Sequence, residues 1–191
     1  KAQSQEDVGI RRAMILVAGE LVGPLESQSE RTTALRKDDP LAVTLLQLYR
    51  DDPDPGIHAA TAWTLQLYQQ EVEMTRINRE LTSTSPVGDR QWYVTPQGHT
   101  MVVIPGPTQF MMGSPRSAAD RVDNEPWHSE RIRHSFCLAN CETTVEQFNR
   151  FLRAPGDVLA DSMEIGDALL DSPRSNVTWY AAAAYCNWLS E

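Results

Sequence analysis

Basic residues are scarce in this chain of 191 residues, where 17 Lys and Arg stand against 26 Asp and Glu, for a formal net charge of −9. This balance argues against a nucleic-acid binder, which usually carries a basic stripe, and against attraction to an anionic membrane surface. Long apolar runs are also lacking, since none approaches the roughly 20 residues that span a bilayer. The first residues contain no apolar core of a signal peptide. Neither nucleic acid nor membrane is therefore expected as a partner.

Cysteine is scarce too, with only Cys137, Cys141 and Cys186. Three cysteines are too few for a disulfide scaffold and fit a reducing compartment, so the predicted location is the cytoplasm. Cys137 and Cys141 would lie roughly 13 Å apart on an extended strand, beyond disulfide reach. All three are interpreted as structural cysteines, with a redox or metal role as the alternative.

Motifs with catalytic or metal chemistry are missing. No glycine-rich phosphate loop and no GxSxG element occur, and the four histidines lack a metal-ligand spacing such as HxxxH. His58 is expected to face solvent near a helix start, and His134 to lie on the apolar side of a strand as a core histidine. His128 with Glu125 and Glu130 comes nearest to a divalent-ion site. No catalytic, cofactor-binding or metal-binding residue is assigned.

Helical patterns fill the first 81 residues. The predicted helices span residues 7–22, 40–51, 56–70 and 71–81, the last either extending the third helix or separate from it. Asp7, Asp39 and Asp54 are predicted to cap the first three. Residues 24–37 are predicted to be a loop or a frayed helix. In the first helix, the apolar stripe expected to face the core consists of Ile10, Ala13, Met14 and Val17.

An internal repeat relates the first and third helices. A shift of 47 residues places Asp7 on Asp54, Gly9 on Gly56, Ile10 on Ile57 and Ala13 on Ala60. This period is typical of HEAT-type helical repeats, and residues 1–81 are therefore interpreted as a HEAT-like segment. The alternative is two unrelated amphipathic helices with the same capping habit. Because about three repeats are normally needed for stability, further helices are expected before Lys1.

A linker and a β-rich region follow. Residues 82–90, rich in Ser, Thr, Pro and Gly, are predicted to link two domains. Strands are predicted at 92–94 and 101–104 around a turn at 96–98, with another apolar run at 109–112 and a strand at 131–138. Between these last two, residues 114–130 are predicted to form a long surface loop. Trp127 and His128 in that loop are the candidate partner-contact residues.

Two helices are predicted near the end of the chain. Thr143 and Glu146 suggest a capping box for a helix with Val145, Phe148, Phe151 and Leu152 on one face. Residues 154–176 are predicted to be a loop. Thr178 would cap a last helix over 179–191, whose apolar residues are Trp179, Ala182, Ala183, Cys186, Trp188 and Leu189.

Four segments of the second half resemble the formylglycine-generating enzyme, or sulfatase-modifying factor, family. Met101–Gly106 with Phe110 and Met112–Ser114 is similar to the opening "MVxIPGGxFxMGS" of that family. Glu125, Pro126 and His128 match the next block, and Glu142–Phe151 resembles an "EVTxxQYxxF" helix. Val177–Ser190 resembles "VSWxDAxAYCxWLS", with Ala181 where the family often has Asp.

The resemblance implies that residues 91–191 form the N-terminal part of such a domain, with an α+β fold related to C-type lectins. Some family members oxidise a cysteine of a sulfatase with copper and oxygen, and their catalytic cysteine pair lies in a later segment than this chain contains. No cofactor is assigned to this chain, although copper or calcium would suit the complete domain. Cys186 matches a common family position, where burial is expected.

These observations predict an α+β chain with a HEAT-like helical segment (1–81), a linker (82–90) and an incomplete formylglycine-generating-enzyme-like domain (91–191). The predicted function is that of a protein-binding or regulatory module within a multidomain bacterial protein. Its partner would be a protein or the remainder of the domain. The alternative is part of an oxidase that modifies a cysteine in a protein substrate. The sequence beyond Glu191 would distinguish the two.

Overall fold

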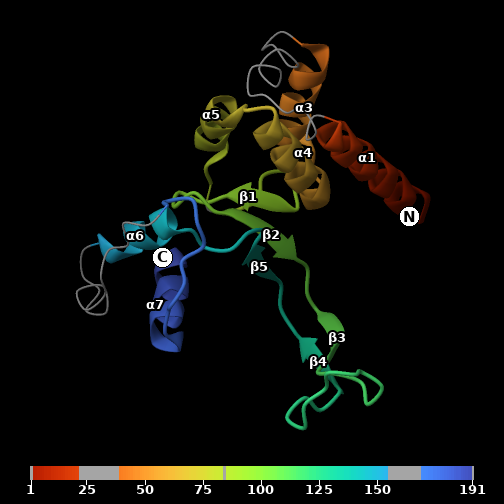
Figure 1. Ribbon diagram of the computed structural model, residues 1–191, viewed down its shortest axis with the longest axis vertical. Coiled ribbons are helices and arrows are strands. Elements are labelled where there is room, and N and C mark those ends of the chain that lie inside the picture. Colours follow the sequence, from red (N-terminus) through yellow and green to blue (C-terminus); the bar gives the residue numbers. More distant parts are fainter. Residues whose placement is uncertain (1, 22–38, 84, 155–168, 191) are drawn as a thin grey trace. The chain divides into compact units, whose positions relative to one another are not determined.

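The computed structural model describes residues 2–21, 39–83, 85–154 and 169–190, with side chains from Asp7 onwards. Two compact units make up the chain: unit 1 comprises Lys1–Val102 and Ala139–Glu191, and unit 2 comprises Val103–Leu138. The predicted mixture of helices and antiparallel strands is confirmed (Figure 1). The predicted loop at 24–37 and most of the one at 154–176 lie outside the described residues.

The helices at the start of unit 1 are α1 (Ala2–Glu20), α3 (Pro40–Asp51), α4 (Pro55–Leu67) and α5 (Glu71–Leu81). Two predicted caps are confirmed. Asp39 accepts a hydrogen bond from the Leu41 N–H at 2.8 Å, and Asp54 accepts from the N–H groups of Gly56 and Ile57. The predicted cap Asp7 is wrong, because α1 already begins at Ala2. Of the two alternatives for residues 71–81, the separate helix is confirmed, because α5 does not extend α4.

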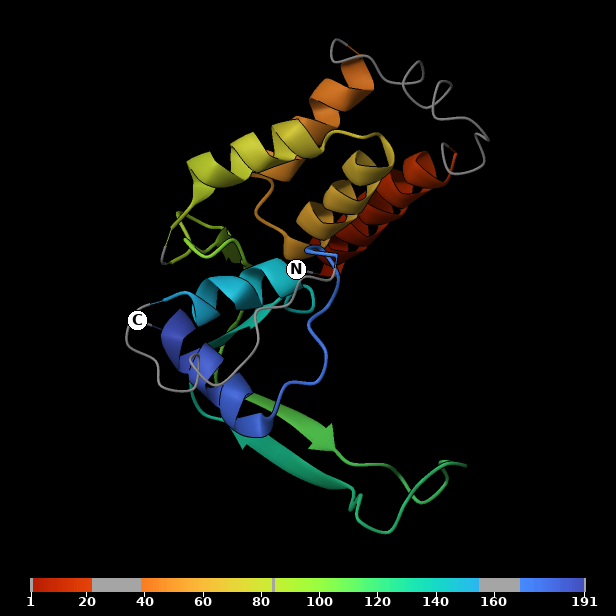
Figure 2. The ribbon, with the colours of Figure 1, turned by 60° about the vertical axis from the view of Figure 1, so that its left-hand side comes forward.

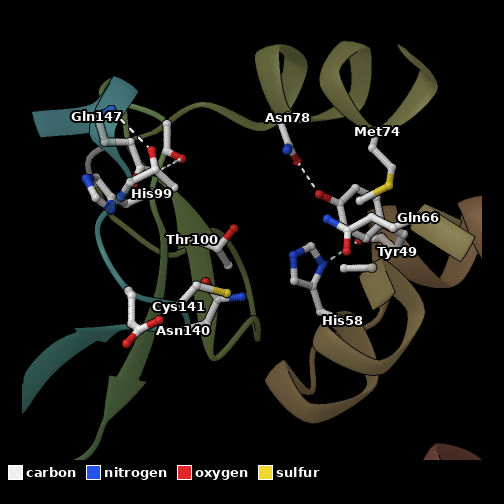
Figure 3. A pocket seen from close by; sticks show the side chains of 14 residues that line it. Tyr49, His58, Gln66, Met74, Asn78, His99, Thr100, Asn140, Cys141 and Gln147 are labelled. Carbon is white, nitrogen blue, oxygen red and sulfur yellow. Dashed lines mark hydrogen bonds between the residues drawn. The ribbon is translucent and has the colours of Figure 1, made fainter. Parts of the chain in front are cut away.

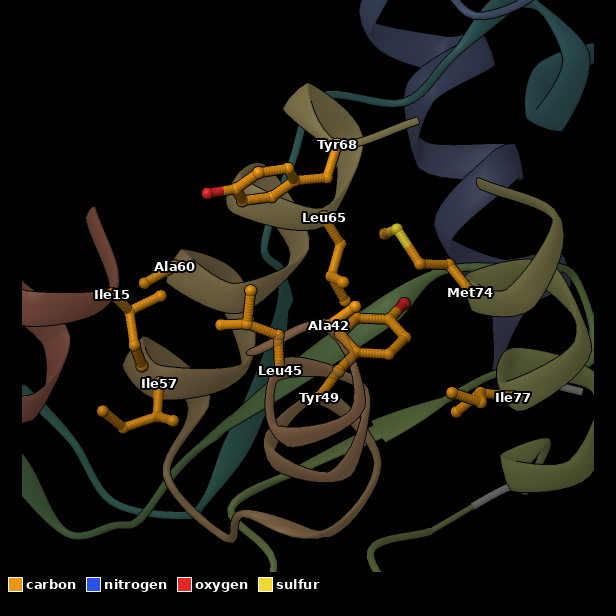
Figure 4. Close-up of a cluster of buried hydrophobic side chains, with 10 residues drawn as sticks. All are labelled: Ile15, Ala42, Leu45, Tyr49, Ile57, Ala60, Leu65, Tyr68, Met74 and Ile77. Atoms are coloured by element: carbon orange, nitrogen blue, oxygen red, sulfur yellow. The ribbon is translucent and has the colours of Figure 1, made fainter. Parts of the chain in front are cut away.

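The apolar stripe expected to be the inner face of α1 is exposed, which corrects the prediction for Ile10, Ala13, Met14 and Val17. Ile15 faces the core instead, and the Gly19 backbone lies so close to Trp63 that a Cβ there would meet the ring at 2.4 Å. Both faces of α1 are apolar, so periodicity alone could not choose between them. The buried cluster consists of Ile15, Ala42, Leu45, Tyr49, Ile57, Ala60, Leu65, Tyr68, Met74 and Ile77 (Figure 4).

The predicted hairpin is confirmed. Strand β1 (Trp92–Val94) pairs antiparallel with β2 (Thr100–Ile104), with Trp92 opposite Val102. Gly98 closes the turn with φ +88° and donates its N–H to the carbonyl oxygen of Thr95 at 2.9 Å, a conformation that glycine adopts without steric cost. The strands of this sheet follow the order β1-β2-β5, where β5 is Phe136–Ala139.

Unit 2 contains a second, two-stranded antiparallel sheet. Strand β3 (Thr108–Met112) pairs with β4 (His128–Ile132), and Met112 lies opposite His128. The single strand predicted at 131–138 is therefore wrong. Its alternating pattern belongs to β4 and β5, which lie in different sheets and are separated by residues 133–135. The predicted loop consequently ends at Trp127.

Helices α6 (Val145–Leu152) and α7 (Trp179–Leu189) pack together later in unit 1 (Figure 2). The capping box lies one residue after the predicted pair. Thr144 accepts from the Gln147 N–H at 3.2 Å, and the Gln147 side chain accepts from the Thr144 N–H at 2.9 Å. Thr143 and Glu146 have the same spacing, so the sequence offers two overlapping boxes and only the backbone geometry selects one.

The predicted inner face of α6 is confirmed, because Val145, Phe148, Phe151 and Leu152 are all buried. The predicted inner face of α7 is largely wrong. Ala181 and Tyr185 are its buried residues, with Trp188 half-buried, whereas Trp179, Ala182 and Cys186 are exposed. Aromatic packing sets this phase, since the Tyr185 ring stacks on Phe148 at 5.2 Å and meets Phe151 edge-on at 5.5 Å. The helix ends at Leu189, with Ser190 as its C-cap.

Candidate functional site

A cavity of about 200 Å³ lies within unit 1 (Figure 3). Side chains from α3, α4 and α5 line one side, and the β1–β2 turn with the start of α6 and the segment before it line the other. Its lining consists of Tyr49, His58, Ala62, Gln66, Met74, Asn78, Gly98, His99, Thr100, Asn140, Cys141, Glu142, Thr144 and Gln147. Glu142 carries the negative charge among these mostly neutral groups.

His58 is buried in the wall of this cavity, which corrects the expectation that it faces solvent. Its ring is stacked between Tyr49, at a centroid distance of 4.4 Å, and Trp92, at 3.7 Å. Nδ1 lies 2.8 Å from the carbonyl oxygen of Tyr49, and Trp92 Nε1 donates to the carbonyl oxygen of Asp52 at 2.9 Å. Burial lowers the pKa of His58 to about 4, and the Arg90 guanidinium adds to the shift. The ring is therefore neutral and structural.

His99, to which the sequence assigned no role, is buried on the opposite side of the cavity. Its Nε2 lies 2.5 Å from the hydroxyl of Tyr185, which joins the β1–β2 turn to α7. Burial lowers the pKa of His99, with a contribution from the charge of Arg150, and burial raises the pKa of Tyr185. Both groups are therefore neutral near pH 7. The sequence signal that could have found this pair is the position of His99 directly after the turn glycine.

Polar partners within the cavity wall leave it suited to hydrogen bonding rather than to acid–base chemistry. The Tyr49 hydroxyl donates to Asn78 Oδ1 at 2.7 Å, and Gln147 Nε2 donates to the carbonyl oxygen of Gly98 at 3.0 Å. These bonds hold the helical side and the hairpin side of the cavity in place. The cavity can accept water or a small neutral polar group.

The candidate contact residues Trp127 and His128 lie in unit 2, and both are exposed. Trp127 ends the loop, whereas His128 is the first residue of β4 rather than a loop residue. His128 Nδ1 lies 2.7 Å from the Pro126 carbonyl oxygen, and its Nε2 lies 3.1 Å from Glu130 Oε1. Their exposure suits a contact surface, but their binding role stays a prediction. His134 is exposed as well, which corrects its interpretation as a core histidine.

Three apolar residues lie on the neighbouring strand β3, where Met112 is opposite His128. Because side chains alternate along a strand, Phe110 and Met112 project from one face of the sheet and Met111 from the other. Phe110, Met111 and Met112 are between 44% and 55% exposed, and Trp127 is 50% exposed. We call these four residues the apolar ribbon. All residues of unit 2 are described, and none of them is buried. Four Arg oppose four acidic residues in this unit, so its formal charge is zero and the net charge of −9 falls on unit 1.

Metal binding finds little support in the described residues, where no three His, Cys, Asp or Glu side chains gather closely enough to hold an ion. His128 meets Glu130, but Glu125 does not complete a site with them. The cysteines are all free, and Cys141 and Cys186 are exposed, so the expected burial of Cys186 is wrong.

Residues 59–191 match a family model described as the sulfatase-modifying factor enzyme 1-like domain. The chain belongs to this family. The family match begins inside α4, upstream of the predicted linker at 82–90, and the domain boundaries stay a prediction. No curated protein and no solved structure matches the chain.

Membrane insertion through a helix is not indicated. Within the described residues, no helix is both long and apolar enough to cross a bilayer.

Proposed function

We propose that this sulfatase-modifying-factor-like chain acts as a protein-binding module and that the apolar ribbon is its binding surface. The observation that carries the proposal is the exposure of Phe110, Met111, Met112 and Trp127 on a unit that buries none of its residues. A two-stranded hairpin is only marginally stable in water by itself. A partner that covered the ribbon would supply the apolar burial that unit 2 lacks.

The side chains of the ribbon suit protein recognition. Tryptophan is enriched among the residues that dominate binding energies at interfaces, and methionine adapts its shape to irregular partners. Both strands are five residues long, and β3 and β4 pair with each other alone in their sheet among the described residues. Each therefore presents an outer edge that an extended polypeptide can join by backbone hydrogen bonds.

The chemistry of the partner follows from this surface. An extended segment with alternating apolar side chains would pair along one edge and cover Met111 or Phe110. Since unit 2 has a formal charge of zero, a segment of low net charge would meet no repulsion there.

A selection experiment tests the proposal. Random extended peptides would be selected on the intact chain alone, and the affinity of the selected peptides would then be measured by calorimetry. We expect the selected peptides to lose at least about tenfold in affinity with Trp127→Ala. Trp179→Ala is the matched control, because Trp179 is a 75% exposed tryptophan of unit 1 and its loss should leave affinity unchanged. Peptides that bind Trp127→Ala as well as the original chain would refute the proposal, as would a selection that enriches none.

The second candidate function is part of a formylglycine-generating-type oxidase that acts on a cysteine of a protein substrate. Family membership favours it. The chain would be incubated with a sulfatase-type cysteine peptide and copper, and the peptide analysed by mass spectrometry. We expect no formylglycine, because the described cysteines are single and free and the described residues form no metal site. Formylglycine in the peptide would decide for the oxidase.

We also propose the character of the helical repeats, the fold type of the domain, the source and the cellular location. The HEAT-like nature of the helical segment is supported by the 47-residue repeat and by the packing of α1 against α4. A lectin-related fold and a place in a multidomain bacterial protein rest on the family resemblance. The cytoplasmic location rests on the three free cysteines.

A further inference from the structure

Helix α1 has an outer apolar face in addition to the one that packs on α4. Ile10, Met14, Val17 and Leu21 are 57%, 67%, 57% and 74% exposed, and we call them the outer stripe. Their spacing places them on one side of the helix. Among the described residues nothing covers this stripe. Isolated exposed apolar residues are ordinary, but a contiguous stripe of four marks an interaction surface.

The internal repeat shows what the stripe corresponds to. With the shift of 47 residues, Val17 is equivalent to Thr64 and Leu21 to Tyr68. Thr64 in α4 and Tyr68, the C-cap of α4, are buried and receive α1. Thr64 Oγ1 donates to the carbonyl oxygen of Ile15 at 3.1 Å, and the Tyr68 hydroxyl donates to the carbonyl oxygen of Ala18 at 3.1 Å.

The other equivalent positions agree. Ile10 corresponds to Ile57, Ala13 to Ala60 and Met14 to Thr61, and these three residues of α4 are buried. The face of α1 that is exposed is thus the face of α4 that α1 and its neighbours cover. A further helix that lay on the stripe would pack against α1 as α1 packs against α4.

We propose that the outer stripe of α1 receives an amphipathic α-helix of a protein partner, docked in the way that α1 docks on α4. This surface is distinct from the apolar ribbon of unit 2. It extends the function proposed above to a second, helical class of partner.

The inner face of α1 specifies the chemistry of that helix. It would carry a branched apolar residue where α1 has Ile15 and a very small one where α1 has Gly19, since that glycine allows close approach to α4. A basic residue is expected near its first turns. Arg12 of α1 lies beside Gly56 at the start of α4, and the equivalent end of α1 presents Asp7, an exposed carboxylate.

The stripe is also more apolar than its counterpart. Met14 and Val17 stand where α4 has Thr61 and Thr64, and each of those hydroxyls donates to a backbone carbonyl oxygen. The partner helix would therefore be held by apolar burial rather than by hydroxyl hydrogen bonds. A charged residue placed in the stripe should be poorly tolerated when it is buried.

The probe for this surface is a synthetic peptide of residues 2–21, which contains α1, with Leu16→Lys so that a side-chain lactam to Glu20 holds it helical. Its binding to the intact chain would be measured by fluorescence anisotropy. We expect Val17→Glu in the chain to weaken binding by at least about tenfold. Val72→Glu is the matched control, because Val72 is an 81% exposed valine on α5 and its replacement should change nothing.

Substitutions in the peptide test which of its faces docks. Ile15→Glu in the peptide should abolish binding, and Val17→Glu in the peptide should leave it unchanged. Binding that the chain variant Val17→Glu leaves intact would show that the peptide displaces α1 from α4, which overturns the proposal. A dimer of the chain that Val17→Glu dissociates would assign the stripe to a second copy and overturn it as well, as would absence of binding at the solubility limit.

Discussion

The two units differ in whether they have a buried core. Unit 1 buries two apolar clusters, a mostly aliphatic one on α1 and α3–α5 and an aromatic-rich one between α6 and α7. Unit 2 leaves Phe110, Met111, Met112 and Trp127 about half exposed and buries no residue. The two units also differ in formal charge, because unit 2 is neutral and the net charge of −9 lies on unit 1.

This difference separates residues that hold the fold from residues that are available to partners. A buried apolar side chain of unit 1, such as Phe151, contacts other side chains of the same unit instead of water, and removing it should destabilise the protein. In unit 2 the same kind of side chain remains in water, so its removal should affect binding and leave stability almost unchanged.

The largest expected contrast is in proteolysis. Subtilisin, a protease of broad specificity, should cut first in the exposed loop of unit 2 at residues 114–127, or within residues 82–90, and long before it cuts inside Leu41–Leu48 of α3. Cutting inside a packed helix requires cooperative opening, so the rates should differ on the order of a thousandfold or more. Mass spectrometry of the first fragments measures this, and early cleavage inside Leu41–Leu48 would contradict the contrast.

Truncation of one phenylalanine in each unit sharpens the comparison. Phe151 is 0% exposed and contacts three aromatic rings, so Phe151→Ala should lower the free energy of unfolding by about 3–5 kcal/mol. Phe110 is 44% exposed, and Phe110→Ala should change it by about 0.5 kcal/mol at most. Urea unfolding followed by circular dichroism would show the difference, and equal effects would mean that unit 2 has a core of its own.

The buried histidines make the stability of unit 1 depend on pH. The unfolded chain protonates His58 below its ordinary pKa of 6.5, whereas the folded chain does so only below about 4. Stability is therefore fully present above about pH 6.5 and falls as the pH drops towards 4, by about 3 kcal/mol from this residue. The lowered pKa of His99 acts in the same direction.

Unfolding by urea at several pH values measures this slope. His58→Gln should flatten it, even if the variant is less stable at every pH, because the titrating ring is gone. His134→Gln in unit 2 should leave the slope as it is, since His134 is exposed. An unchanged slope in His58→Gln would show that other groups cause the acid sensitivity.

The smallest expected effect concerns the cap of α6. Thr144→Ala removes the hydroxyl that accepts from the Gln147 N–H and should lower stability by about 1 kcal/mol. Thr108→Ala in unit 2 is the control. Thr108 begins a strand and caps no helix, so its replacement should have a smaller effect on stability. Thermal unfolding resolves a difference of this size, and an unaffected melting temperature in Thr144→Ala would contradict the role of the cap.

Local signals predicted the elements of this fold well. The Asp39 and Asp54 caps, the turn at Gly98 and the inner face of α6 all depend on residues within one or two helical turns of each other. Short-range geometry determines such features, so a single sequence contains them.

Features that depend on distant partners could not be predicted. His58 is buried because Tyr49 and Trp92 enclose it, and Trp92 lies 34 residues further along the chain. The inner face of α1 was missed for the same reason, since Ile15 and the outer stripe have the same periodicity and only α4 distinguishes them. The exposure of Trp127 could be predicted because it lies in a polar segment, which is itself a local property, whereas the binding role of Trp127 and His128 stays a prediction.

Trp92 packs against the turn between α3 and α4. This contact limits where gene fusion can separate the helices from the hairpin. Trp92 is 0% exposed, its Nε1 bonds to the Asp52 carbonyl oxygen, and the Gln91 N–H donates to the carbonyl oxygen of Pro53 at 3.0 Å. A recombination event that joined a new partner at residue 91 would leave this indole without its cover. The helices and the hairpin are therefore expected to travel together in any rearrangement that keeps the hairpin folded.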